Sequence, residues 1–317
     1  MRTLEFIVPS EYDGRKVLHY LRGSAGLSSR LIRNLKMFEN GMMLNGVHTR
    51  TVDIIHTGDK ITVNLPEDEV ADTAADIYEM PTLCSTSESS DDSLCASFTF
   101  TSLADYGVEI LYEDEDLIVV NKPATLAIHP SHNHQGDTLA NLIAAYLKTK
   151  NRVSVFRAVG RLDKGTSGIV ICALNAFAAN KLQGNIRKTY YALPSGRYSG
   201  SGTVNAPIYR PDPIKTYRTV DDRGDYAVTH WTALKTGEEM SLVRVNLETG
   251  RTHQIRVHFA HLGTPLVGDT MYGEPDERIS HQSLHCGEAE FKHPYSGDDI
   301  VITANIPNDM QALIDTM

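Results

Sequence analysis

A strongly acidic stretch divides this chain into two parts. From Glu67 to Asp116 the sequence holds 15 acidic residues and no Lys or Arg. Part of it, PTLCSTSESSDDSLCASFTFTS, is rich in Ser, Thr and Asp and lacks sustained hydrophobic periodicity, which is typical of a linker or an irregular insertion. Like charges repel one another and extend such a segment. The sequence therefore predicts two folding units, over 1–66 and 108–317, joined by an acidic segment over 67–107.

The same stretch determines how the net charge is interpreted. A formal net charge of −10 disfavours binding to a phosphate backbone, which requires Lys and Arg. Of the 40 acidic residues, however, only 25 lie outside the stretch, where all 30 basic residues are found. The two predicted units are together net positive, so the total charge does not exclude a nucleic-acid ligand.

The sequence lacks the patterns of membrane spans, secretion signals and small metal or redox motifs. Residues 1–9 form a short apolar patch with no positive region ahead of a long hydrophobic stretch, and no later segment reaches the length of a membrane span. We expect a cytoplasmic protein. The cysteines form no C-x-x-C pair, so free thiols are expected rather than a zinc ribbon or a redox centre. These cysteines are Cys84, Cys95, Cys172 and Cys286.

The segment from Gly14 to Leu65 predicts two helices followed by short strands, a compact α+β unit. In GLSSRLIRNLKMFENG a serine can cap the second helix, and Leu31, Ile32 and Leu35 fall on one side of it. The other side carries three cations, Arg30, Arg33 and Lys36. A basic stripe of this kind suits a phosphate backbone, but it is also typical of an ordinary solvated helix face.

The order LSSRLIRNLK, NGMMLNGV and HTGDKITV resembles the small alpha-L RNA-binding domain. That domain is shared by a small-subunit ribosomal protein, some tRNA synthetases and many pseudouridine synthases. The resemblance implies that residues 1–66 bind RNA and that the three helix cations contact it.

After Tyr106 the pattern is rich in strands that do not alternate regularly with helices. Strands are expected in VEILYEDEDLIVVNKP, GIVICAL and KTYYAL, and a hairpin in YAVTHWTALK and MSLVRVNLE. Helices are expected at TLANLIAAYLK, after Asn175, and from a cap at Thr249 or Thr252 to Gly263. We predict an α+β domain with a mixed or largely antiparallel central sheet, and not a doubly wound fold.

The string GRLDKGTSGIVICAL places a carboxylate between two cations ahead of a buried strand. Neighbouring Arg161 and Lys164 favour the charged form of Asp163, which a nucleophile or a general base needs. A structural ion pair beside a turn is the alternative interpretation. The string lacks G-K-[ST], so it is not a phosphate-binding P-loop.

The string ETGRTHQIRVHFAHLG places Arg251 and Arg256 near the start of a predicted helix. Free N–H groups at a helix start, together with guanidinium groups, suit a phosphate or a carboxylate. Histidines gather here and in HPSHNH without matching Cys or acidic ligands, so we predict no metal site and favour packing or RNA contact. These histidines are His129, His132, His134, His253, His258 and His261.

Six strings together resemble the RluA/RluD-type pseudouridine synthases over residues 108–307. They are NKPATLAIHP, GRLDKGTSG, RKTYYAL, ETGRTHQIRVHFAHLGTPLVGDTMYG, SLHC and FKHP, in the family's order. The resemblance implies the pseudouridine synthase fold with a cleft, and an isomerase that needs no cofactor and acts as a monomer. Its substrate is expected to be RNA, with large-subunit ribosomal RNA the family's commonest target and transfer RNA the alternative.

The resemblance also implies roles for individual residues. Asp163 corresponds to the essential carboxylate, and Tyr190 to an aromatic that stacks on the target uracil and is a candidate base. Arg256 is expected to pair with Asp163, and Leu284 to line the pocket. Cations expected to contact the RNA are Arg161, Lys164 and Arg251.

Four positions depart from the family pattern, although none removes a catalytic group. Gly160 and Gly165 replace a frequent His and a frequent acid, Thr125 replaces a Gly, and Cys286 replaces an Ala. Two other classes of protein are considered. A catalytically silent RNA-binding or ribosome-assembly protein could retain the fold, and a glycosidase also acts at an anomeric carbon but normally needs two paired acids.

Overall fold

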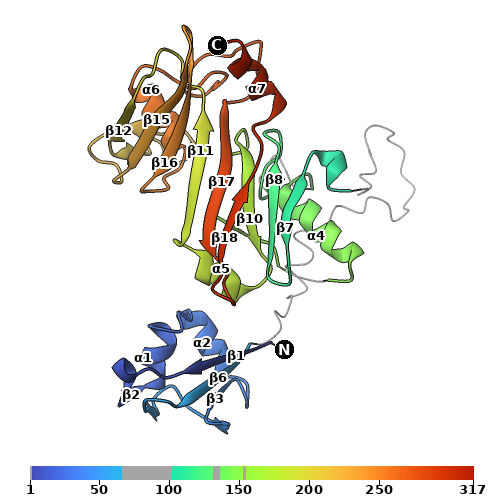
Figure 1. The fold of residues 1–317 in the computed structure, drawn as a ribbon, viewed down its shortest axis with the longest axis vertical. Helices are drawn as coiled ribbons and strands as arrows, with labels where there is room; N and C mark the ends of the chain where they lie inside the picture. The colour runs from blue at the N-terminus through green and yellow to red at the C-terminus, as the bar shows by residue number, and fades with distance from the viewer. Residues whose placement is uncertain (1, 66–101, 131–135, 153–154) are drawn as a thin grey trace.

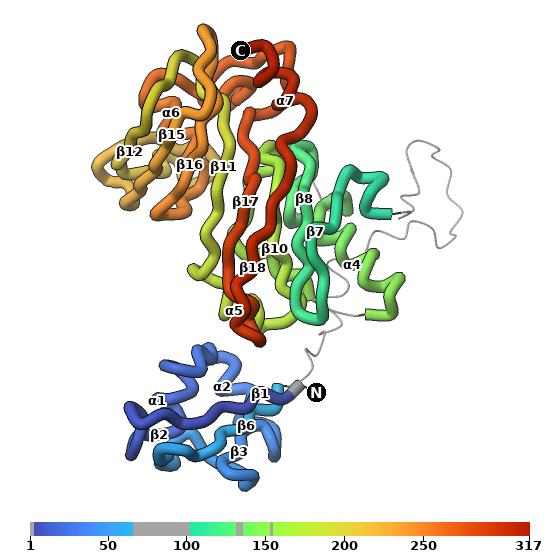
Figure 2. Tube along the Cα trace, in the orientation of Figure 1, coloured from blue at the N-terminus to red at the C-terminus, as the bar shows by residue number. Residues whose placement is uncertain are grey.

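The chain folds into two units, each with its own hydrophobic core (Figures 1 and 2). Leu103 is already buried in the larger core, ahead of the boundary predicted at position 108. Most of the predicted acidic segment, over 67–107, lies outside the described residues. The computed structural model describes residues 2–65, 102–130, 136–152 and 155–317.

The smaller unit combines antiparallel strands with two short α-helices and one 3-10 helix. Its four-stranded sheet has the order β1-β6-β3-β4, and a second pair of strands joins β2 to β5. The strands are β1 (Arg2–Ile7), β2 (Arg15–Lys16), β3 (Met42–Leu44), β4 (Val47–His48), β5 (Ile54–Ile55) and β6 (Lys60–Leu65). The helices are η1 (Ser10–Tyr12), α1 (Val17–Arg22) and α2 (Ser29–Leu35).

Helix α2 forms where the sequence predicts it. The Ser28 side chain accepts a hydrogen bond from the Leu31 backbone N–H at 3.1 Å, which caps the helix start. Ile32 and Leu35 are buried in the smaller core. The three predicted cations of this helix are exposed on the outer side: Arg30, Arg33 and Lys36.

The larger unit is built on a ten-stranded sheet. Its main path is β12-β15-β16-β11-β17-β10-β8-β7, with β18 added to β17 and β9 to β10. Of the described strand pairs, only β10 with β17 is parallel. The predicted α+β class with a largely antiparallel sheet is confirmed.

The strands of this sheet are β7 (Glu109–Glu113), β8 (Leu117–Lys122), β9 (Arg157–Val159), β10 (Ser167–Ala173), β11 (Ile186–Ala192), β12 (Ser201–Asn205), β15 (Val228–Thr236), β16 (Ser241–Leu247), β17 (Leu284–Lys292) and β18 (Asp299–Thr303). A separate pair joins β13 (Ile208–Tyr209) to β14 (Thr219–Val220). The helices are η2 (Ala104–Tyr106), α4 (Leu139–Thr149), α5 (Ala176–Leu182), α6 (Gln254–His261) and α7 (Asn308–Asp315). None of the helices in the described ranges has both the length and the apolar character needed to cross a bilayer.

Two of the three helices predicted in this unit have the expected starts, and the third does not. Thr138 and Asn141 form a capping box at α4, and Asn175 caps α5. The expected cap of α6 at Thr249 or Thr252 is wrong, because His253 occupies the N-cap position without a capping side-chain bond. The Thr249 hydroxyl oxygen accepts a hydrogen bond from the Val228 N–H at 3.0 Å, and its hydrogen is donated to the Gln254 side chain at 2.8 Å, so it does not cap α6.

Helix α5 of the larger unit contacts the smaller unit. Phe177 of this helix is buried in the smaller core, where Tyr295 also packs. The Asn180 side chain donates a hydrogen bond to the Gly26 carbonyl at 3.1 Å. The two units therefore meet on a helix whose carboxyl end leads directly toward β11.

The parallel pair β10 and β17 approaches so closely that it requires a glycine. Gly168 has φ 108°, and a Cβ atom built there would lie 2.2 Å from the Cys286 carbonyl oxygen. All seven residues of β10 are buried, so neither strand can move aside freely. This close approach holds the loop that precedes β10 against the centre of the sheet.

We predict that Gly168→Ala lowers the free energy of unfolding by about 3 kcal/mol, from backbone strain and from overlap with β17. Gly200→Ala is the matched control, since Gly200 also has positive φ but a Cβ there meets nothing within 4 Å. The control should lose only about 1 kcal/mol. Urea unfolding of both variants makes the comparison, and equal losses would contradict the role of the close approach.

Candidate active site

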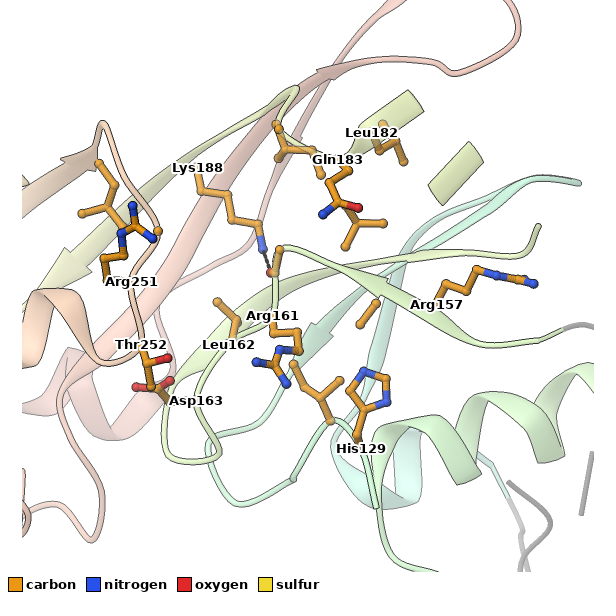
Figure 3. Close-up of a pocket in the computed structure, with 18 of the residues that line it drawn as sticks. His129, Arg157, Arg161, Leu162, Asp163, Leu182, Gln183, Lys188, Arg251 and Thr252 are labelled. Atoms are coloured by element: carbon orange, nitrogen blue, oxygen red, sulfur yellow. Dashed lines mark hydrogen bonds between the residues drawn. The ribbon is translucent and has the colours of Figure 1, made fainter. Parts of the chain in front are cut away.

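Asp163 lies in the turn that joins β9 to β10, at the wall of a cavity of about 1120 Å³ (Figure 3). Its backbone carbonyl accepts a hydrogen bond from the Thr166 N–H at 3.1 Å, which closes the turn. Its side chain is 26 % exposed. The carboxylate is thus open to the cavity while its backbone is held by a buried strand.

Cations outnumber acids around this cavity. The cavity is lined by the segment before β10, by the residues from the end of α5 into β11, and by the loop before α6. Besides Asp163, the only carboxylate among the described residues that line the cavity is that of Glu248. The lining cations are Arg157, Arg161, Lys164, Lys188 and Arg251. Such a surface attracts an anionic ligand.

Arg256 joins two carboxylates from different parts of the chain. Its Nε and Nη2 donate to Asp269 Oδ2 and Oδ1 at 2.7 and 2.8 Å, a bidentate pair. Its Nη1 donates to Asp163 Oδ2 at 3.2 Å. The Arg256 side chain is 6 % exposed and that of Asp269 is fully buried. The pairing expected between Arg256 and Asp163 is present, and Asp269 fixes the guanidinium that makes it.

Tyr190 of β11 lines the same cavity and is largely buried. Burial raises its pKa well above the ordinary value of 10, and the nearby Cys286 and Asp163 act in the same direction. The side chain is therefore a neutral phenol at neutral pH, so it presents an aromatic face and a hydroxyl group to the cavity.

Lys122, at the end of β8, is a buried cation that the sequence motifs did not identify. Its Nζ donates to the carbonyl oxygens of Pro123 and Leu126 at 2.8 Å, and to that of Lys164 at 3.0 Å. Burial lowers its pKa to about 7, although the negative charge of Asp163 opposes the shift. The side chain ties the strand β8 to the turn that carries Asp163.

Lys188 braces the same turn from the other side. Its Nζ donates to the Gly160 carbonyl at 2.6 Å (Figure 3). It also donates to the Ile169 carbonyl at 3.2 Å. Burial lowers its pKa. Lys188 belongs to the string RKTYYAL, in which the sequence predicted a role only for Tyr190.

The other predicted site residues differ in whether they line the cavity. Arg161 and Lys164 are exposed at the cavity wall, whereas Arg251 lines it but also approaches Asp225 at 3.4 Å. Leu284 is not among the described residues that line the cavity; it is buried on β17 in the same core as Tyr190, and its expected role at the pocket stays a prediction. The α2 cations belong to the smaller unit and do not line the cavity either.

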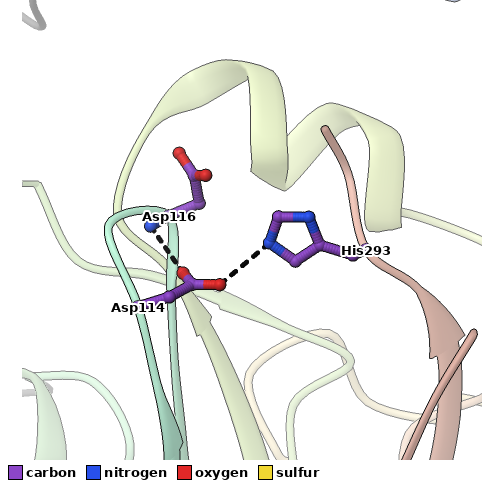
Figure 4. A group of neighbouring side chains, drawn as sticks. All are labelled: Asp114, Asp116 and His293. Carbon is purple, nitrogen blue, oxygen red and sulfur yellow. Dashed lines mark hydrogen bonds and ion pairs between the residues drawn. The ribbon is translucent and has the colours of Figure 1, made fainter. Parts of the chain in front are cut away.

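A group of possible metal ligands lies away from this cavity, at Asp114, Asp116 and His293 (Figure 4). The Asp114 oxygens already accept hydrogen bonds from His293 Nε2 at 2.9 Å, from the Tyr112 hydroxyl, and from the backbone. Asp116 accepts one from Asn175 at 2.8 Å. These bonds link the turn between β7 and β8 to the chain after β17 and to the start of α5, which is a structural role.

The histidines of the two clusters do not converge on one point within the described residues. Both ring nitrogens of His258 are engaged, with the Thr229 hydroxyl and the Ala206 carbonyl at 2.9 Å. His129 packs on Phe156. His132 and His134 lie outside the described residues.

Comparisons with known proteins agree with this geometry. Residues 116–261 match the family described as RNA pseudouridylate synthase. The chain is 35 % identical over 299 residues to an uncharacterized RNA pseudouridine synthase, YjbO, of Bacillus subtilis, covering 92 % of this chain and 96 % of that one. It is 37 % identical over 232 residues to the ribosomal large subunit pseudouridine synthase D of Salmonella typhimurium, covering 67 % and 71 %.

A solved structure shares the fold of the larger unit. The human RNA pseudouridylate synthase domain containing 1 superposes with a TM-score of 0.53 at 25 % sequence identity. The match covers 63 % of this chain and 84 % of the human one.

We predict that the stability difference between the wild type and Lys122→Met depends on pH. A lysine in the unfolded chain loses its proton near 10.5, whereas Lys122 in the folded protein loses it near 7. Between these values the unfolded state binds more protons, so the wild type gains stability relative to the variant as pH rises. Urea unfolding across that range tests this, and a constant difference would contradict it.

Proposed function

The chain belongs to the family of RNA pseudouridylate synthases, and from this premise we propose that it isomerises uridines of ribosomal RNA with Asp163 as the catalytic carboxylate. The expected RluA/RluD-type family and the expected isomerase class are confirmed by the comparisons. The observation that carries the proposal for Asp163 is its place: a partly exposed carboxylate at a cationic cavity, paired with the buried Arg256.

The choice of ribosomal RNA is supported by a relative. The Salmonella relative is named for the large ribosomal subunit, and it covers two thirds of this chain. Transfer RNA is the alternative outcome. We expect the enzyme to recognise a folded loop of the RNA, so the protein sequence alone does not identify the target uridine.

The cavity suits a nucleotide that has left its helix. A base must be flipped out of its stack to reach an enclosed carboxylate, at a cost of a few kcal/mol that is smaller in loops and bulges than in duplex. Exposed Arg161 and Lys164 flank Asp163 and can compensate by binding the phosphates on either side of the flipped uridine. The base would then stack on Tyr190.

The reaction moves the uracil without changing its composition. The bond from uracil nitrogen-1 to ribose breaks, the base rotates, and carbon-5 joins the sugar in its place. Asp163 would attack the anomeric carbon or the uracil ring, or assist formation of a glycal, and each route requires an ionised carboxylate. A base then removes the carbon-5 proton. Asp163 suits this step better than Tyr190, whose raised pKa keeps its proton in place.

We predict that Asp163→Asn abolishes tritium release from RNA that carries tritium at uridine carbon-5, because an amide can neither attack nor accept the proton. Ribosomal and transfer RNA transcripts are compared as substrates. Glu248→Gln is the matched control, since it removes the other carboxylate at the cavity wall and should retain activity. Tight RNA binding without release by the wild type would instead favour the silent RNA-binding protein.

We propose that the smaller unit adds a phosphate contact through α2. Replacing Arg30, Arg33 and Lys36 by Gln should reduce the slope of log K against log salt by about 2 to 3, since each phosphate contact contributes about 0.7 to 0.9. Release of tritium at saturating RNA should not change. Replacing Arg15, Arg22 and Arg50 makes the same charge change off α2, and an equal effect on the slope would contradict a specific role for this helix.

A further inference from the structure

His253 has an unusual backbone conformation beside the proposed catalytic carboxylate. Within the described residues, three residues other than glycine have positive φ: His253, Asn45 and Asn151. Asparagine tolerates this conformation because its short side chain bonds locally; histidine also adopts it more often than most residues, but the left-handed conformation still costs about 1 to 2 kcal/mol. At φ 58° the chain enters α6 without a capping side chain. A strained residue of this kind points to a function for its side chain.

The ring of His253 is held by Tyr272. His253 Nδ1 lies 2.8 Å from the Tyr272 hydroxyl, and that hydroxyl accepts a hydrogen bond from the Arg218 backbone N–H at 3.0 Å. The phenolic hydrogen is therefore available for Nδ1. Burial lowers the pKa of His253, and Arg256 and Arg218 act in the same direction although Asp163 and Asp269 oppose them. We assign the neutral tautomer with its hydrogen on Nε2, because Nδ1 then accepts the phenolic hydrogen of Tyr272.

Nε2 of His253 faces the same carboxylate oxygen as Arg256. It lies 3.9 Å from Asp163 Oδ2, and Arg256 Nη1 lies 3.2 Å from that oxygen. The other tautomer would direct a lone pair at the carboxylate, which is unfavourable. A separation of 3.9 Å exceeds a hydrogen bond, but such contacts commonly shorten when substrate binds.

We propose that His253 is a positioning residue that, together with Arg256, holds Asp163 Oδ2 and leaves Oδ1 to react with the uridine. This inference rests on the proposed function of Asp163. Once the His253 contact shortens, two N–H donors hold Oδ2 and restrict rotation of the carboxyl group about its Cβ–Cγ bond. The reacting oxygen is then presented in one orientation, and small misplacements of reacting groups reduce rates on the order of 10²-fold.

Two substitutions separate this role from a purely structural one. In His253→Gln the amide nitrogen can occupy the place of Nε2 and donate to Asp163. In His253→Asn the amide reaches only the place of Nδ1, so it can keep the Tyr272 contact and suits positive φ, but it cannot reach Asp163. A structural role favours the Asn variant, and the positioning role favours the Gln variant.

The experiment is tritium release under saturating and limiting RNA, with the full-length wild type and both variants. We expect His253→Asn to lower kcat on the order of 10²-fold with KM unchanged, and His253→Gln to recover at least about tenfold of that loss. Thermal unfolding checks that both variants fold. Tyr272→Phe, which frees the ring, should lower kcat less than His253→Asn and provides a second reading if a His253 variant does not fold.

The outcomes are distinct. If the wild type is active and the Asn variant equals or exceeds the Gln variant, the positioning role is overturned while the proposed function stands. An inactive wild type on both RNA pools overturns the proposed function, and this inference falls with it.

Discussion

The site depends on one buried guanidinium group. Arg256 stands on α6, Asp163 on the turn before β10, and Asp269 on the loop after α6, so the group connects segments that are distant in sequence. A buried arginine is tolerable only when its charge is compensated, and the bidentate pair with Asp269 provides that compensation. The remaining nitrogen can then face Asp163 without Asp163 having to neutralise it. The carboxylate that we propose as catalytic is in this way oriented by an ion pair, while its side chain is still 26 % exposed.

Positioning of the turn relies on polar contacts from the buried Lys122 and the partly buried Lys188 as much as on packing. Lys122 and Lys188 each donate to carbonyl oxygens of the segment around Asp163, from β8 on one side and from β11 on the other. Inside a protein such bonds are strong, and an unsatisfied member is costly, so the turn has few alternative conformations. The closely packed pair of β10 and β17 fixes the strand from which the turn departs. The geometry of one carboxylate is thus determined by four strands of the sheet, β8, β10, β11 and β17.

Sequence patterns predicted the elements better than the contacts between them. Strands and helices are local, and their hydrophobic periodicity and caps at Ser28, Thr138 and Asn175 can be read from neighbouring residues. The pairing of Arg256 with Asp163 was expected only because a family resemblance supplied it. Lys122, Asp269 and His253 were missed as partners of the site, since nothing in their local sequence shows which distant group they contact. Asp269 and Tyr272 did stand in the quoted GDTMYG string, which was the available signal.

The role of Leu284 at the pocket, which family position implied, stays a prediction, since the side chain is buried on β17 in the core that also contains Tyr190. One failure has a clear physical origin. The α6 cap was assigned to a threonine because threonine caps helices, but the Thr249 hydroxyl oxygen accepts from the Val228 N–H and the chain enters the helix through a left-handed histidine. A tertiary contact overrides the local preference. The total charge of the chain is a poor guide to RNA binding for a similar reason, since a phosphate responds to the nearby field of the cationic cavity and not to the sum over the chain.

The same cations that attract RNA would also weaken a carboxylate nucleophile if they contacted its reacting oxygen. Holding one oxygen with N–H donors, while the other faces the substrate, resolves that conflict.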